Sequence, residues 1–236
     1  MYDDIADIWD PVYRARGRDY AGEVGQVLDA IRHRGPLGES LLDVACGTGE
    51  HLAHFGDHFP HVEGVELSEG MIAVGKRRRP ELTLTHGDMR TFDLGRTFDV
   101  ITCMFSSIGH AVDTDELAAT LTRFGAHLAP GGVLVVEPWW FPSTFVDGYV
   151  TGDVLDVDGQ TMARVSHSSR EGNYSRVRVH YVVAGAAEGL RHVTEDLRIT
   201  LFTKEEYLRG FERAGLAVEY VEGGPSGRGL FIAEHP

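Results

Sequence analysis

A glycine loop that follows an apolar strand constrains this chain most. Residues 41–44 have the pattern of a short buried strand, the small residues at 45–49 form a turn, and a helical pattern covers 50–59. Glycine lets a ligand approach the main chain, and the N-terminus of a helix presents free N–H groups. The order strand, glycine loop, helix predicts a nucleotide-type pocket at a strand end.

The spacing of the loop glycines excludes some nucleotides. A dinucleotide loop needs a third glycine after Gly47 and Gly49, but that position is Leu52, which argues against NAD and FAD. No lysine follows the loop as in phosphate loops, which excludes ATP hydrolysis. Two carboxylates remain: Asp43 inside the loop and Glu66 at the end of the next strand. A carboxylate in the second place can accept two hydrogen bonds from a ribose diol.

Three motifs carry a family resemblance. DVACGTG, VELS and HGDMR, in this order, resemble the motifs of class I S-adenosylmethionine-dependent methyltransferases, although Ala45 replaces the usual first loop glycine. The resemblance implies an α/β, Rossmann-like fold with a mixed seven-stranded sheet and helices on both faces. It also implies that Asp88 accepts from the adenine amino group and that the backbone N–H of Met89 donates to the ring. From the residues alone, Asp88 is as well explained as a turn aspartate.

Charge and cysteine content limit the partners. The chain has 22 Lys and Arg against 36 Asp and Glu, a formal charge of −14, which disfavours nucleic acid. Cys46 and Cys103 are far apart and are expected to be reduced and structural. Neither a secretory signal nor a membrane-length apolar run is evident, so a cytoplasmic location is expected.

The pattern divides the chain into four segments. We expect a helical lid at 1–34, a cofactor-binding α/β core at 35–149, an antiparallel β insertion at 150–200, and the rest of the core with a substrate loop at 201–236. The aromatic residues of the first segment suit either a cap over the sheet or a lid that excludes water from the pocket, and the two are compatible.

A helical face with three histidines raises the question of a metal. His51, His54 and His58 are spaced to share one face of the predicted helix 50–59. Nothing in the sequence completes a ligand set with a carboxylate or a cysteine, so a polar helix face is the better interpretation and no metal is predicted.

Three later positions follow predicted strands or lie between them. His110 follows strand 98–104, where acceptor chemistry is expected in this topology, although a lone histidine is more often merely packed. Trp139 and Trp140 form an apolar wall, suited either to the core or to a flat substrate ring. Arg228 lies among glycines, either as a solvated hairpin residue or free to bind phosphate.

A closer resemblance covers roughly residues 2–232. The segments TCMFSSIGH, VVEPWWFP, RVSHSSREG and EGGPSGRGLF resemble those of the N,N-dimethyltransferases that act on dTDP-activated amino-deoxysugars in antibiotic biosynthesis, such as those of desosamine and mycaminose. The resemblance implies that the amino group of a dTDP-linked sugar takes two methyl groups from S-adenosylmethionine.

The same resemblance assigns the site residues. It makes His110 the candidate base, and Tyr2 the residue that orients the nitrogen or accepts a hydrogen bond from it. An aliphatic ammonium, with a pKa of about 10, must lose its proton before it can attack, so the site needs such a base or a pocket that disfavours the cation. It gives Arg228 the diphosphate and Tyr20 the nucleotide. The substrate set is Tyr20, Ser106, Trp139, Trp140 and Arg228, and the cofactor set is Tyr13, Ala45, Gly47, Glu66, Leu67, Met71, Asp88, Met89 and Met104.

Two other functions stay open at this stage. A small-molecule O-methyltransferase would need a stronger base or a divalent metal. A non-catalytic S-adenosylmethionine-binding protein is possible because fold does not fix function. The position of the amine, C3 or C4, and the natural product are also open, as is a homodimer that pairs through the edges of the insertion.

Overall fold

The computed structural model describes residues 2–187 and 189–235. Seven strands form its larger sheet: β1 (Ser40–Val44), β2 (His61–Glu66), β3 (Thr83–His86), β4 (Phe98–Cys103), β5 (Leu128–Val136), β10 (Ala217–Val221) and β11 (Leu230–Glu234). Their order is β10-β11-β5-β4-β1-β2-β3. Only the pairs of β11 with β5 and β10 are antiparallel among the pairings described in this sheet. The predicted mixed seven-stranded sheet is confirmed.

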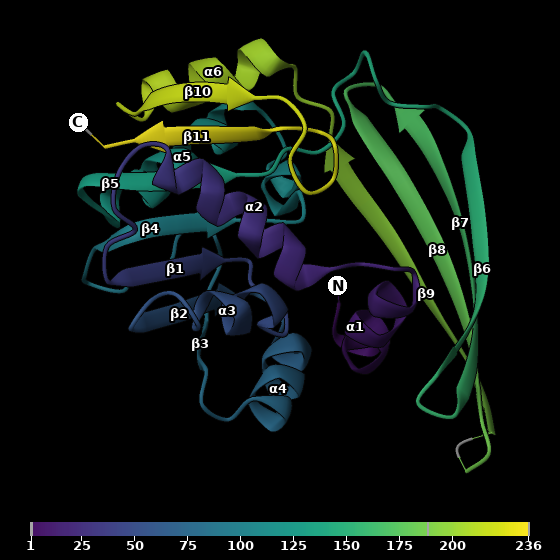
Figure 1. Ribbon diagram of the computed structural model, residues 1–236. Coiled ribbons are helices and arrows are strands. Elements are labelled where there is room, and N and C mark those ends of the chain that lie inside the picture. The colour runs from purple at the N-terminus through teal and green to yellow at the C-terminus, as the bar shows by residue number, and fades with distance from the viewer. Residues whose placement is uncertain (1, 188, 236) are drawn as a thin grey trace.

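Helices cover both faces of this sheet (Figure 1). The helices are η1 (Asp3–Ile5), α1 (Ala6–Ala15), α2 (Tyr20–Arg32), α3 (Glu50–Phe55), α4 (Glu69–Arg78), η2 (Ser107–His110), α5 (Thr114–Ala126) and α6 (Lys204–Arg213). Side chains alternate along β1, so Leu41 packs on the side of α2 and α3 while Leu42 packs on the side of α5 and α6. Both leucines are fully buried, as expected for a parallel strand with helices on both sides.

Side chains cap two helices at their first turns. Ser68 caps α4 by accepting from the Met71 N–H. Thr203 and Glu206 form a capping box at the start of α6, in which each side chain accepts from the backbone N–H of the other residue.

The antiparallel insertion forms a second sheet beside the first (Figure 1). Its strands are β6 (Tyr149–Val157), β7 (Gln160–Glu171), β8 (Tyr174–Gly185) and β9 (Gly189–Thr200), which pair in chain order. The inner face of this sheet packs against η1 and α1, which contribute Ile5, Ile8 and Val12. α2 instead packs on the larger sheet. The N-terminal segment thus places only η1 and α1 between the two sheets.

The predicted helix 50–59 is too long. The structure ends α3 at Phe55, where Gly56 terminates it, so His58 lies beyond the helix. The three histidines therefore do not share one helical face. Within the described residues, no helix is long and apolar enough to cross a membrane.

Candidate active site

A cavity of about 840 Å³ lies at the ends of the core strands, and η1, α1 and the inner face of β7–β9 also line it. All sixteen predicted site residues line this cavity: Tyr2, Tyr13, Tyr20, Ala45, Gly47, Glu66, Leu67, Met71, Asp88, Met89, Met104, Ser106, His110, Trp139, Trp140 and Arg228. The structure thus brings together predicted residues from three of the four segments, and the insertion at 150–200 adds lining residues that were not predicted, such as Arg164 and Glu195. Their individual roles stay predictions.

The glycine loop is open toward this cavity. Gly47 has a φ of +59°, and a Cβ built there would meet no atom within 4 Å. Gly49, at φ +84°, is closely packed instead, because a Cβ there would lie 2.8 Å from a methyl carbon of Leu82. Gly47 is therefore the place where a ligand can approach the backbone, and Gly49 holds the loop against β3.

The departure from the usual motif at Ala45 has a structural cost, because Ala45 adopts a φ of +58°. A residue with a Cβ in the left-handed conformation costs roughly 1–2 kcal/mol. Replacing Ala45 by glycine removes this strain, but the greater flexibility of glycine in the unfolded chain offsets about 0.5–1 kcal/mol of the gain. We expect Ala45→Gly to raise the free energy of unfolding by about 0.5–1 kcal/mol, measured by urea denaturation. Ala53→Gly inside α3 is the control and should lose about 1 kcal/mol. A loss in both variants would contradict the assignment of strain to Ala45.

Glu66 closes the loop from the end of β2. Its carboxylate accepts from the backbone N–H of Gly47 at 2.9 Å and of Ser68 at 2.7 Å. Burial raises the pKa of Glu66, and these backbone bonds oppose the rise. The carboxylate is thereby fixed at the strand end, with lone pairs left for the hydroxyls of a ribose.

Asp43 differs from its prediction, because it lies in β1 and not in the loop. It is buried, accepts from the Thr102 hydroxyl at 2.8 Å, and burial raises its pKa to about 6.

Asp88 is paired as well. Arg90 Nε donates to it at 2.7 Å, which holds the pKa of Asp88 below its usual range, and Arg90 also reaches Glu116 at 3.2 Å. The charge of Asp88 is therefore held in place beside Met89. Arg90 is the last residue of the motif HGDMR, in which the resemblance assigns a role only to Asp88 and Met89.

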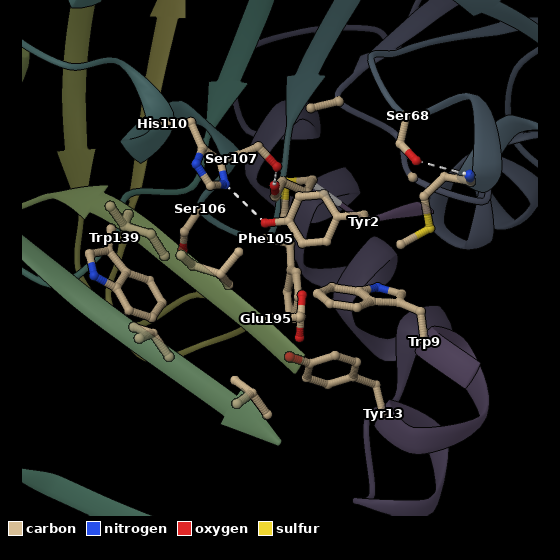
Figure 2. Close-up of a pocket in the computed structure, with 18 of the residues that line it drawn as sticks. Tyr2, Trp9, Tyr13, Ser68, Phe105, Ser106, Ser107, His110, Trp139 and Glu195 are labelled. Carbon is tan, nitrogen blue, oxygen red and sulfur yellow. Dashed lines mark hydrogen bonds between the residues drawn. The ribbon is translucent and has the colours of Figure 1, made fainter. Parts of the chain in front are cut away.

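Tyr2 and His110 meet although they are 108 positions apart (Figure 2). The Tyr2 hydroxyl lies 3.0 Å from His110 Nε2. The backbone of Arg198 favours the charged form of the His110 ring, as a carbonyl acceptor facing Nδ1 would. With Nδ1 protonated, Nε2 of the neutral ring is an acceptor and Tyr2 donates to it.

Burial sets the protonation of this pair. It lowers the pKa of His110 and raises that of Tyr2 well above its usual value. At neutral pH the pair is therefore an uncharged imidazole and an uncharged phenol.

The loop before His110 is held by a residue that sequence reasoning left without a role. Phe105 and Ser106 have φ values of +56° and +65°. Glu137, fully buried after β5, accepts from the Phe105 N–H at 2.7 Å. A carboxylate after a strand was the signal that identified Glu66, and it would have identified Glu137.

Arg228 is not free, contrary to one interpretation of its loop. Its Nε donates to the Pro138 carbonyl at 3.1 Å, and an Nη donates to the Ser106 hydroxyl at 2.9 Å. The guanidinium carbon lies 5.2 Å and 5.3 Å from the ring centroids of Trp139 and Trp140. Burial lowers the pKa of Arg228. The hydroxyl of Ser106 donates in turn to Pro138, so Ser106 orients Arg228.

The sequence left open whether Trp139 and Trp140 belong to the core or to a substrate wall, and the structure places the two residues differently. Trp139 donates from Nε1 to Ser175 of β8 at 2.9 Å and packs against the insertion. Trp140 is 37% exposed. Both still line the cavity. Trp139 is therefore part of a packed wall as well as of the cavity surface.

One of the three candidate metal histidines has another partner. His51 Nε2 lies 2.7 Å from a carboxylate oxygen of Glu23. Across residues 2–187 and 189–235, no three His, Cys, Asp or Glu side chains gather to hold a metal ion.

A mixed, mostly parallel sheet with an open glycine loop, a carboxylate closing it from the next strand and a second carboxylate after β3 defines a class I S-adenosylmethionine-dependent methyltransferase. A family model described as a methyltransferase domain matches residues 41–132. The chain is 54% identical to the dTDP-3-amino-3,6-dideoxy-alpha-D-glucopyranose N,N-dimethyltransferase of Streptomyces fradiae, over 97% of this chain and 89% of the relative. The chain belongs to this family of dTDP-amino-deoxysugar N,N-dimethyltransferases.

Solved structures agree with this assignment. The crystal structure of Streptomyces venezuelae DesVI matches with a TM-score of 0.93 and 54% identity, over 97% of both chains. CalS10, an amino pentose methyltransferase of Micromonospora echinaspora solved with bound S-adenosylmethionine, matches with a TM-score of 0.88 and 47% identity, also over 97% of both chains.

Proposed function

We propose that this enzyme transfers two methyl groups in succession from S-adenosylmethionine to the amino group of a dTDP-linked amino-deoxysugar in natural-product biosynthesis. The hydrogen-bonded pair of Tyr2 and His110 carries the proposal, because it lies in the cavity that the glycine loop and Glu66 also line. Relatives that the chain matches over nearly its whole length are named for this reaction.

The cavity residues fit the cofactor. S-adenosylmethionine, when bound, supplies an electrophilic methyl group on a positively charged sulfur. The open side of Gly47 leaves room beside the backbone, and Glu66 offers acceptors for ribose hydroxyls. We assign Asp88 and Met89 to the adenine, and the remaining members of the cofactor set, Tyr13, Ala45, Leu67, Met71 and Met104, to the walls around it.

Tyr2 and His110 prepare the amine. A nitrogen placed beside Tyr2 can donate N–H to the phenol oxygen while the Tyr2 hydroxyl donates to His110 Nε2. After the first transfer the nitrogen is a secondary ammonium and must lose a proton before it can attack again. Tyr2 can pass that proton to the neutral imidazole, which makes His110 the base.

The buried imidazole predicts a pH dependence. Because burial lowers the pKa of His110 below its ordinary 6.5, the base is active above that lowered pKa and is lost as the pH falls through it. We expect kcat at saturating substrate to fall on the acid side with a midpoint below about pH 6.5, measured from pH 5 to 8. His110→Gln should lack this limb. A midpoint above 6.5, or an unchanged limb in the variant, would contradict the assignment.

The part of the cavity around Arg228 is assigned to the nucleotide. We propose that Arg228, held flat by Ser106 and Pro138, directs its remaining N–H groups to the diphosphate. Tyr20 contacts the nucleotide, and Trp139 and Trp140 bound the sugar. A fixed arginine binds an anion locally even though the chain carries a charge of −14.

Three broader assignments complete the proposal. Segment 1–34 acts as a lid through η1 and α1, which line the cavity. The location is the cytoplasm, consistent with free, buried Cys46 and Cys103. A homodimer forms through the insertion, whose outer face exposes Val154 and Val165, and light scattering would measure its mass.

The reaction is tested by mass spectrometry of dTDP-3-amino-3,6-dideoxyglucose and of a dTDP-4-amino sugar after incubation with enzyme and S-adenosylmethionine. Gain of two methyl masses on one of them is expected and identifies the position of the amine. Methylation of hydroxyl acceptors alone would favour an O-methyltransferase. Cofactor binding without any transfer would favour a binding protein.

A further inference from the structure

A buried carboxylate of the insertion lines the cavity and has no role in the mechanism above. Glu195 lies on the inner face of β9 and is 5% exposed. The Tyr181 hydroxyl donates to its Oε2 at 2.9 Å. Its Oε1 is buried without a hydrogen-bond partner in the described part of the chain. A buried carboxylate oxygen without a donor is costly, so this position calls for a donor from a ligand.

The nearby arginine does not satisfy it. Arg164, on β7, donates to the Ser166 hydroxyl at 3.1 Å and makes no ion pair with Glu195 among the described residues. Its guanidinium lies over the ring of Tyr181 instead. Arg164 therefore offsets the charge of Glu195 from a distance without filling its hydrogen bond.

Glu195 lies beside the reacting end of the cavity. Figure 2 shows its carboxylate between the rings of Tyr2 and Tyr13. Its charge contributes to the raised pKa of both tyrosines. An acceptor nitrogen held by Tyr2 would place the neighbouring carbons of the sugar toward Glu195.

We infer that the free oxygen of Glu195 accepts a hydrogen bond from a hydroxyl on a sugar carbon next to the acceptor amine, which makes Glu195 a specificity-determining residue. The inference rests on the proposed function and names the part of the substrate that this wall of the cavity recognises. The amine itself is the poorer partner, because a carboxylate on the nitrogen would stabilise the ammonium and suppress attack.

The substrates named for three relatives differ in the hydroxyls next to the amine, so they can test whether Glu195 binds such a hydroxyl. One relative acts on a 3-amino-3,6-dideoxy sugar, a second on a 3-amino-3,4,6-trideoxy sugar and a third on a 4-amino-2,3,4,6-tetradeoxy sugar. The first keeps hydroxyls on both carbons next to the amine, the second keeps one, and the third keeps none. All three carry dTDP, so contacts with the nucleotide are matched.

The test compares the Kd of these three nucleotide sugars by calorimetry, with S-adenosylhomocysteine present. The variant Glu195→Leu with Tyr181→Phe removes both hydrogen-bonding partners, which avoids leaving the phenol unsatisfied. Tyr181→Phe alone is the first control. Asp196→Asn is the second, because Asp196 is the next residue of β9 but is exposed on the outer face, where it pairs with Arg176.

The double variant should weaken binding of the 3,6-dideoxy sugar by about tenfold to a hundredfold and that of the tetradeoxy sugar by less than threefold. The trideoxy sugar identifies which hydroxyl is bound. Asp196→Asn should stay within about threefold of the wild type on every sugar, and Tyr181→Phe alone should weaken binding of the 3,6-dideoxy sugar by less than the double variant does. Equal weakening on all three sugars, or none on any, would overturn the inference. Failure of the wild type to methylate any of them would instead overturn the proposed function.

Discussion

Replacing His110 by alanine is expected to lower kcat by about 10²- to 10³-fold. A positioned acid or base contributes 10²–10⁴-fold, and His110 is the group to which Tyr2 donates its hydroxyl hydrogen. Apart from Met104, which begins the connection between β4 and η2, the cofactor set lies on other elements, so the Kd for S-adenosylhomocysteine should change by less than about threefold. Single-turnover kinetics with the amino sugar nucleotide measures the first quantity and calorimetry the second.

Two controls accompany this variant. Tyr2→Phe keeps the ring beside Trp9 but removes the hydroxyl, and we expect a smaller loss of about tenfold because the imidazole is still present. Thermal unfolding of both variants should show that the loop at 105–110 stays folded. A His110→Ala enzyme with kcat within threefold of the wild type would exclude His110 as the base.

Replacing Glu66 by glutamine is expected to weaken cofactor binding by about 100-fold. Hydrogen bonds to a charged acceptor are worth about 1.5–3 kcal/mol each. The N–H groups of Gly47 and Ser68 donate to different oxygens of the Glu66 carboxylate, and the glutamine amide keeps only one acceptor oxygen. Its NH₂ would face the N–H of Gly47 or Ser68, which disturbs the loop as well. Each 1.4 kcal/mol is a factor of ten in affinity. The loss of one hydrogen bond to the Glu66 carboxylate and the weakening of a second therefore give the expected 100-fold change.

The measurement is the Kd of S-adenosylhomocysteine by calorimetry. Glu69→Gln is the matched control, because Glu69 is three residues away, in the first turn of α4, and is exposed. We expect less than a twofold change there. Affinity of Glu66→Gln within threefold of the wild type would show that Glu66 shapes the loop without contacting the ribose.

The local pattern of residues predicted the site of Glu66 but not the pairing of Tyr2 with His110. The partners of Glu66 lie 2 and 19 positions away, close enough for the strand and loop pattern to suggest the site. Tyr2 and His110 are 108 positions apart, and only the family resemblance placed them in one site before the structure was known. Glu195 was missed because a carboxylate on a strand is unremarkable until its long-range surroundings are known, whereas Glu137 was missed although it follows a strand.

Local chemistry therefore determined the strands, the glycine loop, the caps at Ser68 and Thr203 and the antiparallel insertion, because each depends on residues within a few positions of one another. It failed at the end of α3, where the apolar pattern continued but Gly56 ended the helix. The tertiary structure decided that Arg228 is held by Ser106 and Pro138 and that Glu195 lines the cavity with one oxygen free. Burial and hydrogen bonds between distant segments determine whether a side chain is charged and whether its polar atoms have partners. This burial and these hydrogen bonds exist only once the chain has folded.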